Sequence, residues 1–297
     1  MNQEIILDIL RQKNIRLEIK REDLLHPLIS GNKFRKLKYN LLEAKEKNHH
    51  TLLTFGGAYS NHIAATAAAG RAYGFATIGV IRGEELREKA DENPTLSFAR
   101  KEGMKLKFIS RSDFRRKDTP EFQEKLWEEY EPFYLLPEGG TNRLAVKGCE
   151  EILETGDTGF DYICCAVGTG GTIAGLINSS GENQEILGFP ALKGDFLTDD
   201  IRKFAQKDNW RLQNEFHFGG YARVNEDLIR FINDFRQKTG VPLDPVYTGK
   251  MLYGILKLIN NGYFKSGSKV LAIHTGGLQG IPGMNTMLKN KKLPLIR

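Results

Sequence analysis

Cysteine is scarce in this 297-residue chain, which also has neither a long apolar run nor a block of one charge. The three cysteines, Cys149, Cys164 and Cys165, are too few for a disulfide framework, and two of them are sequence neighbours that rarely bridge. No apolar stretch approaches the roughly 18 residues of a membrane span, and the first residues lack the pattern of a secretory signal. We therefore expect a protein of the reducing cytoplasm that neither spans nor binds a membrane.

Charge is nearly balanced, because Lys and Arg number 43 and Asp and Glu 37, which leaves a net charge of +6. This excess is spread along the chain, so it gives no support to nucleic-acid binding. The basic stretch Arg111–Lys117 is expected to be a solvated loop. With 40% hydrophobic residues, the composition is that of a globular protein of one large or two medium domains.

Short apolar runs alternate with segments of helical periodicity, a pattern that predicts an α/β fold with a largely parallel sheet. Several of these runs end in glycine-rich turns, and ligands of open α/β sheets bind at the carboxyl ends of the strands. The predicted strands are Thr51–Phe55, Ala76–Arg82, Lys105–Ser110, Asp161–Val167, Glu185–Phe189 and Lys269–His274.

The glycine-rich segment Gly168–Gly175 follows a predicted strand and opens a predicted helix, a layout that directs backbone N–H groups at a phosphate. It is not the dinucleotide-binding motif, because Ile173 stands where the third glycine would be, and it is not a P-loop. The alternative interpretation is a tight strand-to-helix turn that binds no ligand.

Lys33 lies at the start of a predicted helix whose apolar side is expected to carry Leu37, Leu41 and Leu42. A lysine that is partly buried beside other cations, here Arg35 and Lys36, has a lowered pKa and can form a Schiff base. The alternative is an ordinary solvated side chain.

The segment Gly56–His62 lies between a strand and an alanine-rich helix. Ser60 and Asn61 are expected either to cap this helix or to help its N-terminus hold a substrate carboxylate. Because Ser60 lacks the flanking glycines of a nucleophile elbow, the sequence disfavours a serine hydrolase. The histidines have no zinc-site spacing, so we expect no metal.

Together these segments resemble the fold-type II pyridoxal-phosphate enzymes, and most closely the family of D-cysteine desulfhydrase and 1-aminocyclopropane-1-carboxylate deaminase. The resemblance extends over most of the chain. The segments that carry it, in order, are Ile19–Leu24, Ser30–Lys36, Phe55–His62, Pro137–Gly140, Gly168–Gly175, Gly220-Tyr221, Asp244–Lys250 and His274–Gly277.

The resemblance implies that Lys33 carries pyridoxal 5'-phosphate as a Schiff base and acts as a base at the substrate Cα. Asn61 would hydrogen-bond the hydroxyl of the cofactor ring, and Thr275 would face the ring nitrogen. The phosphate would be bound by the loop residues Gly168, Thr169, Gly170, Gly171 and Thr172.

For the substrate, a small amino acid, the resemblance implies that Ser60, Asn61 and His62 meet the carboxylate. Tyr221 and Tyr247 would orient the amino group or the leaving group and move a proton. The resemblance further implies two domains, a large one of residues 1–41 and 142–297 and a small one of residues 42–141, with the cofactor between them, and a homodimer.

Within the family, Thr248 and Thr275 resemble the desulfhydrase pattern, which favours β-elimination from D-cysteine with release of a 2-oxo acid and ammonia. The alternatives are deamination of 1-aminocyclopropane-1-carboxylate to 2-oxobutyrate, or another D-amino acid lyase or racemase. Two other classes stay open: a non-catalytic binding protein that kept the fold, and a nicotinamide oxidoreductase, which Ile173 disfavours.

Overall fold

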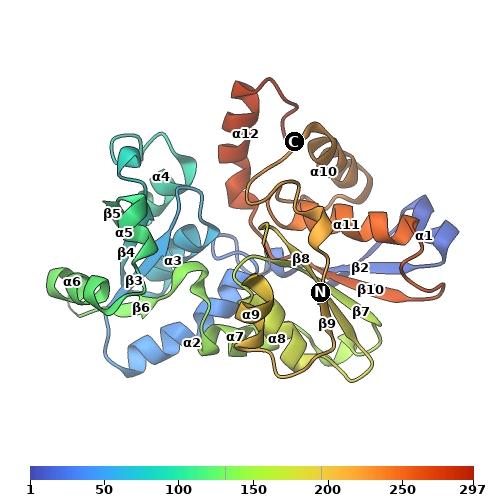
Figure 1. The fold of residues 1–297 in the computed structure, drawn as a ribbon, viewed down its shortest axis with the longest axis horizontal. Coiled ribbons are helices and arrows are strands. Elements are labelled where there is room, and N and C mark those ends of the chain that lie inside the picture. The colour runs from blue at the N-terminus through green and yellow to red at the C-terminus, as the bar shows by residue number, and fades with distance from the viewer. Residues whose placement is uncertain (131, 195) are drawn as a thin grey trace.

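The computed structural model, which describes residues 1–130, 132–194 and 196–297, has two lobes, each built around its own sheet (Figure 1). The larger sheet is formed by β1 (Asn2–Ile5), β2 (Arg16–Lys20), β7 (Tyr162–Val167), β8 (Glu185–Pro190), β9 (Trp210–Leu212) and β10 (Lys269–Ile273). Its strand order is β1-β2-β10-β7-β8-β9, and β1 is antiparallel to β2 whereas the other neighbours are parallel.

The smaller sheet is parallel, with the strand order β5-β4-β3-β6. Its strands are β3 (Thr51–Gly56), β4 (Ala76–Arg82), β5 (Lys105–Ile109) and β6 (Tyr134–Leu136). The predicted α/β fold with mostly parallel sheets is therefore confirmed.

Each predicted apolar run forms a strand, with ends that agree to within one residue. The strands that the sequence reading missed are β1, β2, β6 and β9. Of these, β6 and β9 have three residues each, too few to show a period, whereas β2 contains the charged residues Glu18 and Lys20. Both are buried, and Lys20 is held by an ion pair with Asp157 at 2.6 Å, so tertiary contacts compensate for the polar pattern.

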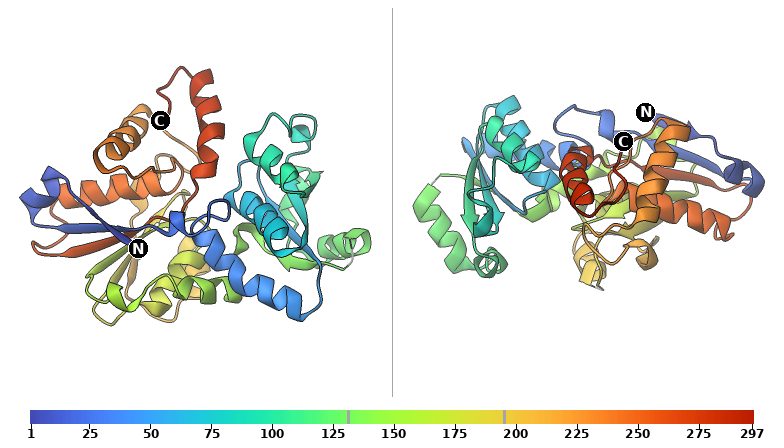
Figure 2. Two further views of the ribbon diagram at one scale, coloured as in Figure 1. Left: turned by 180° about the vertical axis from the view of Figure 1, so that it is seen from behind. Right: turned by 90° about the horizontal axis from the view of Figure 1, so that it is seen from above.

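Helices cover both faces of each sheet, as Figures 1 and 2 show. In the larger sheet the strand residues alternate strictly between two cores. Cys164 and Ala166 pack toward α10 (Glu226–Thr239) and α11 (Thr248–Asn260), whereas Ile163 and Cys165 pack toward α8 (Gly171–Ser179) and α9 (Phe196–Arg202). Because both faces are buried, these strands read as continuous apolar runs. The helices are α1 (Asp8–Lys13), α2 (Asn32–Glu46), α3 (Asn61–Tyr73), α4 (Pro94–Lys101), α5 (Arg111–Arg115), α6 (Pro120–Tyr130), α7 (Arg143–Glu150), α8 (Gly171–Ser179), α9 (Phe196–Arg202), α10 (Glu226–Thr239), α11 (Thr248–Asn260) and α12 (Ile281–Asn290).

Two local predictions are wrong. Leu42 is 49% exposed, because it lies five residues after Leu37 and is turned away from the face that buries Leu37 and Leu41. The basic stretch Arg111–Lys117 begins as the helix α5 rather than a loop, with Phe114 buried beneath it.

The proposed domains follow the two sheets: the strands of the smaller sheet lie within residues 51–136 and those of the larger sheet lie outside that range. In Figure 2 the smaller lobe is joined to the rest through α2, which runs without a break across residues 41 and 42. The boundaries at residues 41 and 142 stay a prediction.

Candidate active site

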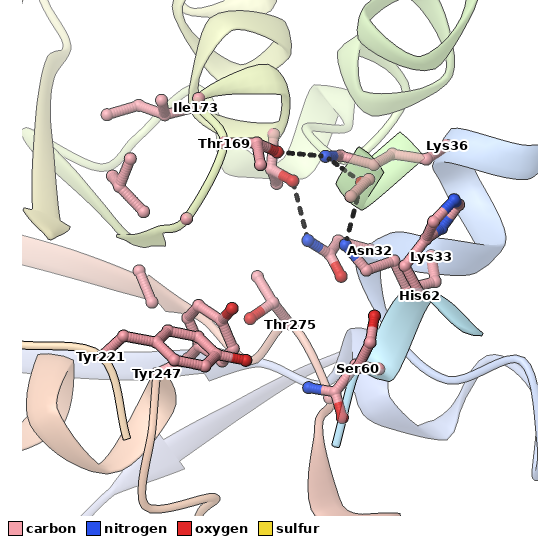
Figure 3. A pocket seen from close by; sticks show the side chains of 18 residues that line it. Asn32, Lys33, Lys36, Ser60, His62, Thr169, Ile173, Tyr221, Tyr247 and Thr275 are labelled. Atoms are coloured by element: carbon pink, nitrogen blue, oxygen red, sulfur yellow. Dashed lines mark hydrogen bonds between the residues drawn. The ribbon is translucent and has the colours of Figure 1, made fainter. Parts of the chain in front are cut away.

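The candidate active site is a pocket between the two lobes that encloses about 630 Å³, part of it open to solvent. The pocket lies where β3, β7 and β10 reach their carboxyl ends, as expected for open α/β sheets. Of the residues that the sequence predicted for the site, all but Gly171 line it: Lys33, Ser60, Asn61, His62, Gly168, Thr169, Gly170, Thr172, Tyr221, Tyr247 and Thr275 (Figure 3).

A close contact between two backbone segments fixes Lys33 next to Thr275. Gly31 has φ +62°, and a Cβ atom at this position would lie 2.0 Å from the carbonyl oxygen of Thr275. The backbone N–H of Asn32 donates to the same oxygen at 3.3 Å. Only glycine allows both the backbone conformation and the approach, so α2 begins against the loop after β10.

The Lys33 amine lies in the pocket and donates to the carbonyl oxygen of Gly139 at 3.2 Å. Burial lowers its pKa well below the ordinary value, and the neighbouring charge of Lys36 lowers it further. A lowered pKa increases the fraction of neutral amine, the form that attacks a carbonyl group. Lys33 is thus suited to Schiff-base formation.

Lys36 is a pocket residue that the sequence reading did not select for the site. Its amine donates to Gly139 O at 3.0 Å, to Thr141 Oγ1 at 2.8 Å and to Thr169 Oγ1 at 3.4 Å, and the residue is 2% exposed. Its spacing from Lys33 was a usable signal, because residues three apart share one face of a helix.

The phosphate-type loop meets α8 at an N-terminus without a side-chain cap, where Gly170 has φ +81°. Thr172 lines the pocket and its hydroxyl accepts a hydrogen bond from Asn32 Nδ2 at 2.8 Å, so this loop is tied to the start of α2. Gly171, the one predicted residue outside the pocket lining, packs instead on Thr141, whose side chain would lie 2.8 Å from an added Cβ.

On the other side of the pocket, Ser60 caps α3, and its hydroxyl oxygen accepts from the N–H of Ile63 at 3.3 Å. The predicted capping is confirmed. A hydroxyl that accepts here keeps its own proton for a second partner. Asn61 follows it, and its side-chain oxygen accepts from Gln279 Nε2 at 2.5 Å, which orients the amide.

His62 is 1% exposed and its ring Nε2 lies 2.9 Å from Thr54 Oγ1. Since Thr54 gives its one proton to Leu136 O at 2.9 Å, His62 Nε2 is the donor in this contact. Burial, followed by the charges of Lys33 and Lys36, lowers the pKa of His62 well below its usual value. In the neutral ring the other nitrogen, Nδ1, is an acceptor, and it has no hydrogen-bond partner among the described residues.

Tyr221 and Tyr247 form an edge-to-face pair with ring centroids 6.2 Å apart. Figure 3 shows them across the cavity from Lys33. Burial, aided by Tyr221, raises the pKa of Tyr247 well above its ordinary value. Burial also raises the pKa of Tyr221, a residue that is 43% exposed. Both side chains therefore stay protonated at neutral pH and can donate a proton.

Thr248, used to choose within the family, does not line the pocket. Its hydroxyl donates to Asp244 Oδ1 at 2.8 Å and accepts from the Asp244 N–H at 3.0 Å, and the residue is fully buried. Thr248 therefore closes the turn before α11, and it leaves Thr275 as the only one of the two residues that can contact a ligand.

In the described part of the chain, no three His, Cys, Asp or Glu side chains lie close enough together to hold a metal ion. The three cysteines are buried and unpaired. No helix among the described residues combines the length and the apolar character needed to cross a membrane.

The family model described as "Pyridoxal-phosphate dependent enzyme" matches residues 7–276. The chain belongs to this family. It is thus an enzyme whose cofactor is pyridoxal phosphate, and the resemblance stated from the sequence is confirmed.

The names of similar proteins include both activities that the sequence suggested. The mitochondrial bifunctional D-cysteine desulfhydrase/1-aminocyclopropane-1-carboxylate deaminase of Arabidopsis thaliana is 32% identical, over 89% of this chain and 73% of its own. A D-cysteine desulfhydrase of Klebsiella pneumoniae is 27% identical, over 87% of this chain and 86% of its own. A solved structure of an "ACC deaminase homologue" matches with a TM-score of 0.83 and 28% identity, over 98% of this chain and 93% of its own.

The pocket of this pyridoxal-phosphate enzyme fits its cofactor. Lys36 is a buried lysine in this pocket, and among residues 1–130, 132–194 and 196–297 no carboxylate forms an ion pair with its amine. Buried charges require a counter-charge. A phosphate at the uncapped start of α8 supplies it, while the aldehyde of the cofactor suits the neutral amine of Lys33.

Proposed function

We propose that this enzyme catalyses β-elimination from a small amino acid, with D-cysteine as the first candidate, giving pyruvate, sulfide and ammonia. The observation that carries the proposal is that two protonated tyrosines, Tyr221 and Tyr247, lie across the pocket from the neutral amine of Lys33. This arrangement supplies a base on one side and acids on the other, as the loss of a Cα proton and a thiolate requires. The names of the relatives support the same chemistry.

When bound, the cofactor supplies the electron sink that makes the Cα proton acidic. Lys33, whose amine lines the pocket, would take that proton. Thr172 and the N–H groups at the start of α8 hold the phosphate, and Lys36 neutralises it. We assign the hydroxyl of the ring to Asn61 and the ring nitrogen to Thr275, which bears no charge and accordingly leaves the ring neutral.

The substrate carboxylate is assigned to the start of α3, where the Ser60 hydroxyl, Asn61 and the backbone N–H of His62 meet it. The helix dipole favours an anion at this end. Tyr247 and Tyr221 then contact the amino group and the leaving thiolate, to which one of them gives a proton. Holding the carboxylate at one end and the leaving group at the other fixes the Cα–H bond toward Lys33.

Deamination of 1-aminocyclopropane-1-carboxylate to 2-oxobutyrate and ammonia is the second candidate. It is favoured by the Arabidopsis relative, whose name joins both activities. The same residues serve either reaction up to the loss of the leaving group or the opening of the ring, so they do not by themselves separate the two.

The test is a comparison of kcat/KM for pyruvate release from D-cysteine with that for 2-oxobutyrate release from 1-aminocyclopropane-1-carboxylate, with L-cysteine as a third substrate. We expect D-cysteine to be preferred, and Lys33→Ala to serve as the inactive control. Preference for the cyclopropane acid would reverse the order of the two candidates. Absence of both activities in cofactor-loaded protein would overturn the proposal.

We also propose that the enzyme acts as a homodimer. In support, the segment before α2 exposes three leucines, Leu24 at 62%, Leu25 at 40% and Leu28 at 47%. Clustered exposed apolar residues mark contact surfaces. Light scattering is the check: Leu24→Asp should shift the mass from dimer to monomer, and a monomeric wild-type enzyme would contradict the proposal.

A further inference from the structure

Lys250, in the first turn of α11, is a buried lysine that does not line the pocket. It is 2% exposed, and its amine donates to two backbone carbonyl oxygens, His217 O at 2.8 Å and Gly220 O at 2.8 Å. Burial lowers its pKa to about 8, while the charge of Asp244 opposes the shift, so the ammonium form still predominates at neutral pH. A buried ammonium group that binds only backbone carbonyls holds a segment of chain in place.

The segment that Lys250 holds leads directly into Tyr221 and lies outside regular secondary structure. Two non-glycine residues here have positive φ, 54° at Phe218 and 54° at Ala222, whereas Gly219 at 89° and Gly220 at 120° adopt values that glycine allows. Positive φ values at non-glycine residues are unfavourable and persist only where surrounding contacts impose them. Tyr221 is thus carried by a turn that does not keep its shape unaided.

Other contacts hold the segment further from Tyr221. Phe218 packs edge to face on Tyr253 of α11 with ring centroids 5.0 Å apart, and Phe216 packs against Gly254. Within the turn, Gly220 N–H donates to His217 O at 3.0 Å and Arg223 N–H donates to Gly220 O at 3.1 Å. The two carbonyls that Lys250 binds are therefore the same two that accept in these turns, the first directly before Tyr221 and the second around it.

Lys250 also lies three residues after Tyr247, which is the N-cap residue of α11. The same helical turn therefore carries one tyrosine of the pocket directly and grips the backbone beside the other. We propose that Lys250 is a positioning residue, which fixes Tyr221 against Tyr247 by tying the turn 217–220 to α11.

This role rests on the proposed function in one respect: a fixed Tyr221 matters for turnover only if the two tyrosines serve the reaction. A displacement of about 1 Å of a reacting group can cost on the order of 10²-fold in rate. Substitution of Lys250 should therefore lower kcat more than it changes KM, because the carboxylate contacts at α3 stay in place.

The test compares Lys250→Met, which keeps the length of the side chain and removes the donors, with Lys257→Met on an exposed position of the same helix. Amide hydrogen exchange is followed at Gly220 and Arg223, in protein with and without cofactor. We expect exchange at both amides to rise at least about tenfold in Lys250→Met and to stay unchanged in Lys257→Met. Unchanged exchange in Lys250→Met would overturn the proposal, whatever the activity of the enzyme.

Kinetics then test the route through Tyr221. Lys250→Met should lower kcat on the order of 10²-fold in the wild type but have little further effect in a Tyr221→Phe background, since both changes remove the same contribution. An equal loss in both backgrounds would show that Lys250 does not act through Tyr221. Should the Met variant not fold, the same measurements are made on Lys250→Gln, which retains an N–H₂ donor. We expect the two amides to keep part of their protection from exchange in this variant. Full loss of protection, or no change, would contradict the proposal. If the enzyme is inactive on the proposed substrates but exchange is faster in Lys250→Met, the proposed function is wrong and the positioning role of Lys250 stands.

Discussion

Helices α3 and α8 both begin at this pocket, and they present their N-termini differently. α3 starts at Ser60, whose hydroxyl caps the helix, whereas α8 starts at Gly170, which has φ +81° and no side chain to offer. Both follow parallel strands and both carry the positive end of a helix dipole. At α8 a lysine also contacts the loop before the helix, because Lys36 donates a hydrogen bond to Thr169.

The difference corresponds to two kinds of anion. A helix start without its own cap is incomplete until an external group accepts its N–H groups, which suits a resident cofactor phosphate. A capped start retains fewer free donors, and it loses less when it is empty, which suits a substrate carboxylate that comes and goes. We therefore expect mutations at α8 to change cofactor affinity and mutations at α3 to change KM.

The largest effect is expected at Lys33, between the two helices. Lys33→Ala should lower kcat by more than about 10³-fold, since a positioned base alone contributes about 10² to 10⁴. Cofactor should still bind at α8, and equilibrium dialysis with absorbance detection measures this. A variant that turned over normally, or one that bound no cofactor at all, would contradict this division of roles, in which α8 binds the cofactor and Lys33 acts as the base.

At α8, Lys36→Met should weaken cofactor binding by about 10- to 150-fold, because loss of a hydrogen bond to a charged group costs about 1.5–3 kcal/mol. KM should change little in the loaded enzyme. Fluorescence titration of cofactor-free protein gives the dissociation constant. Lys38→Met, an exposed lysine of the same helix paired with Glu151, is the control and should bind as the wild type does.

A smaller effect is expected at α3, where Ser60→Ala should raise KM about tenfold, the low end for a charge-assisted hydrogen bond, because the backbone N–H groups remain. Cofactor affinity should not change. Ser110→Ala removes a similar cap from α5, away from the pocket, and controls for lost helix stability. If Ser60→Ala weakened cofactor binding and left KM alone, the assignment of the two helices would have to be exchanged.

The smallest effect concerns the pH dependence of stability through His62, which lies at the α3 end. Its pKa in the folded protein lies well below 6.5, with burial as the main cause. As pH falls below 6.5 the unfolded chain therefore binds a proton that the folded chain does not, and stability falls by up to about 1.4 kcal/mol per pH unit.

Urea unfolding of cofactor-free protein at pH 5 and pH 7.5 measures this loss. His62→Gln retains a donor for Thr54 and should reduce the loss of stability between the two pH values, whereas exposed His50→Gln should not. An unchanged pH dependence in His62→Gln would contradict the assignment.

The apolar runs were sufficient to predict the main strands, because burial on both faces leaves an unbroken hydrophobic signal. Runs of three residues, such as β6 and β9, contain too little pattern for any period to show. β2 was missed for another reason: its buried Lys20 reads as a surface residue until Asp157, distant in sequence, is placed beside it. Likewise, the charged residues of Arg111–Lys117 predict a solvated loop. Phe114 within this stretch is buried, and its packing holds the segment as a helix.

By itself the sequence determined the α/β architecture, the family resemblance and 11 of the 18 residues that line the pocket. These depend on local patterns and on glycine-rich turns, which are recognisable without the rest of the fold. The tertiary structure decided how those residues are used. It alone showed that Lys36 contacts Thr169 of the glycine-rich loop and that Thr248 lies outside the pocket. It also showed that the His62 ring is hydrogen-bonded to Thr54. It also brought Lys250 to the turn of Tyr221. Such contacts join residues far apart in the chain, and their direction depends on packing that no local pattern encodes.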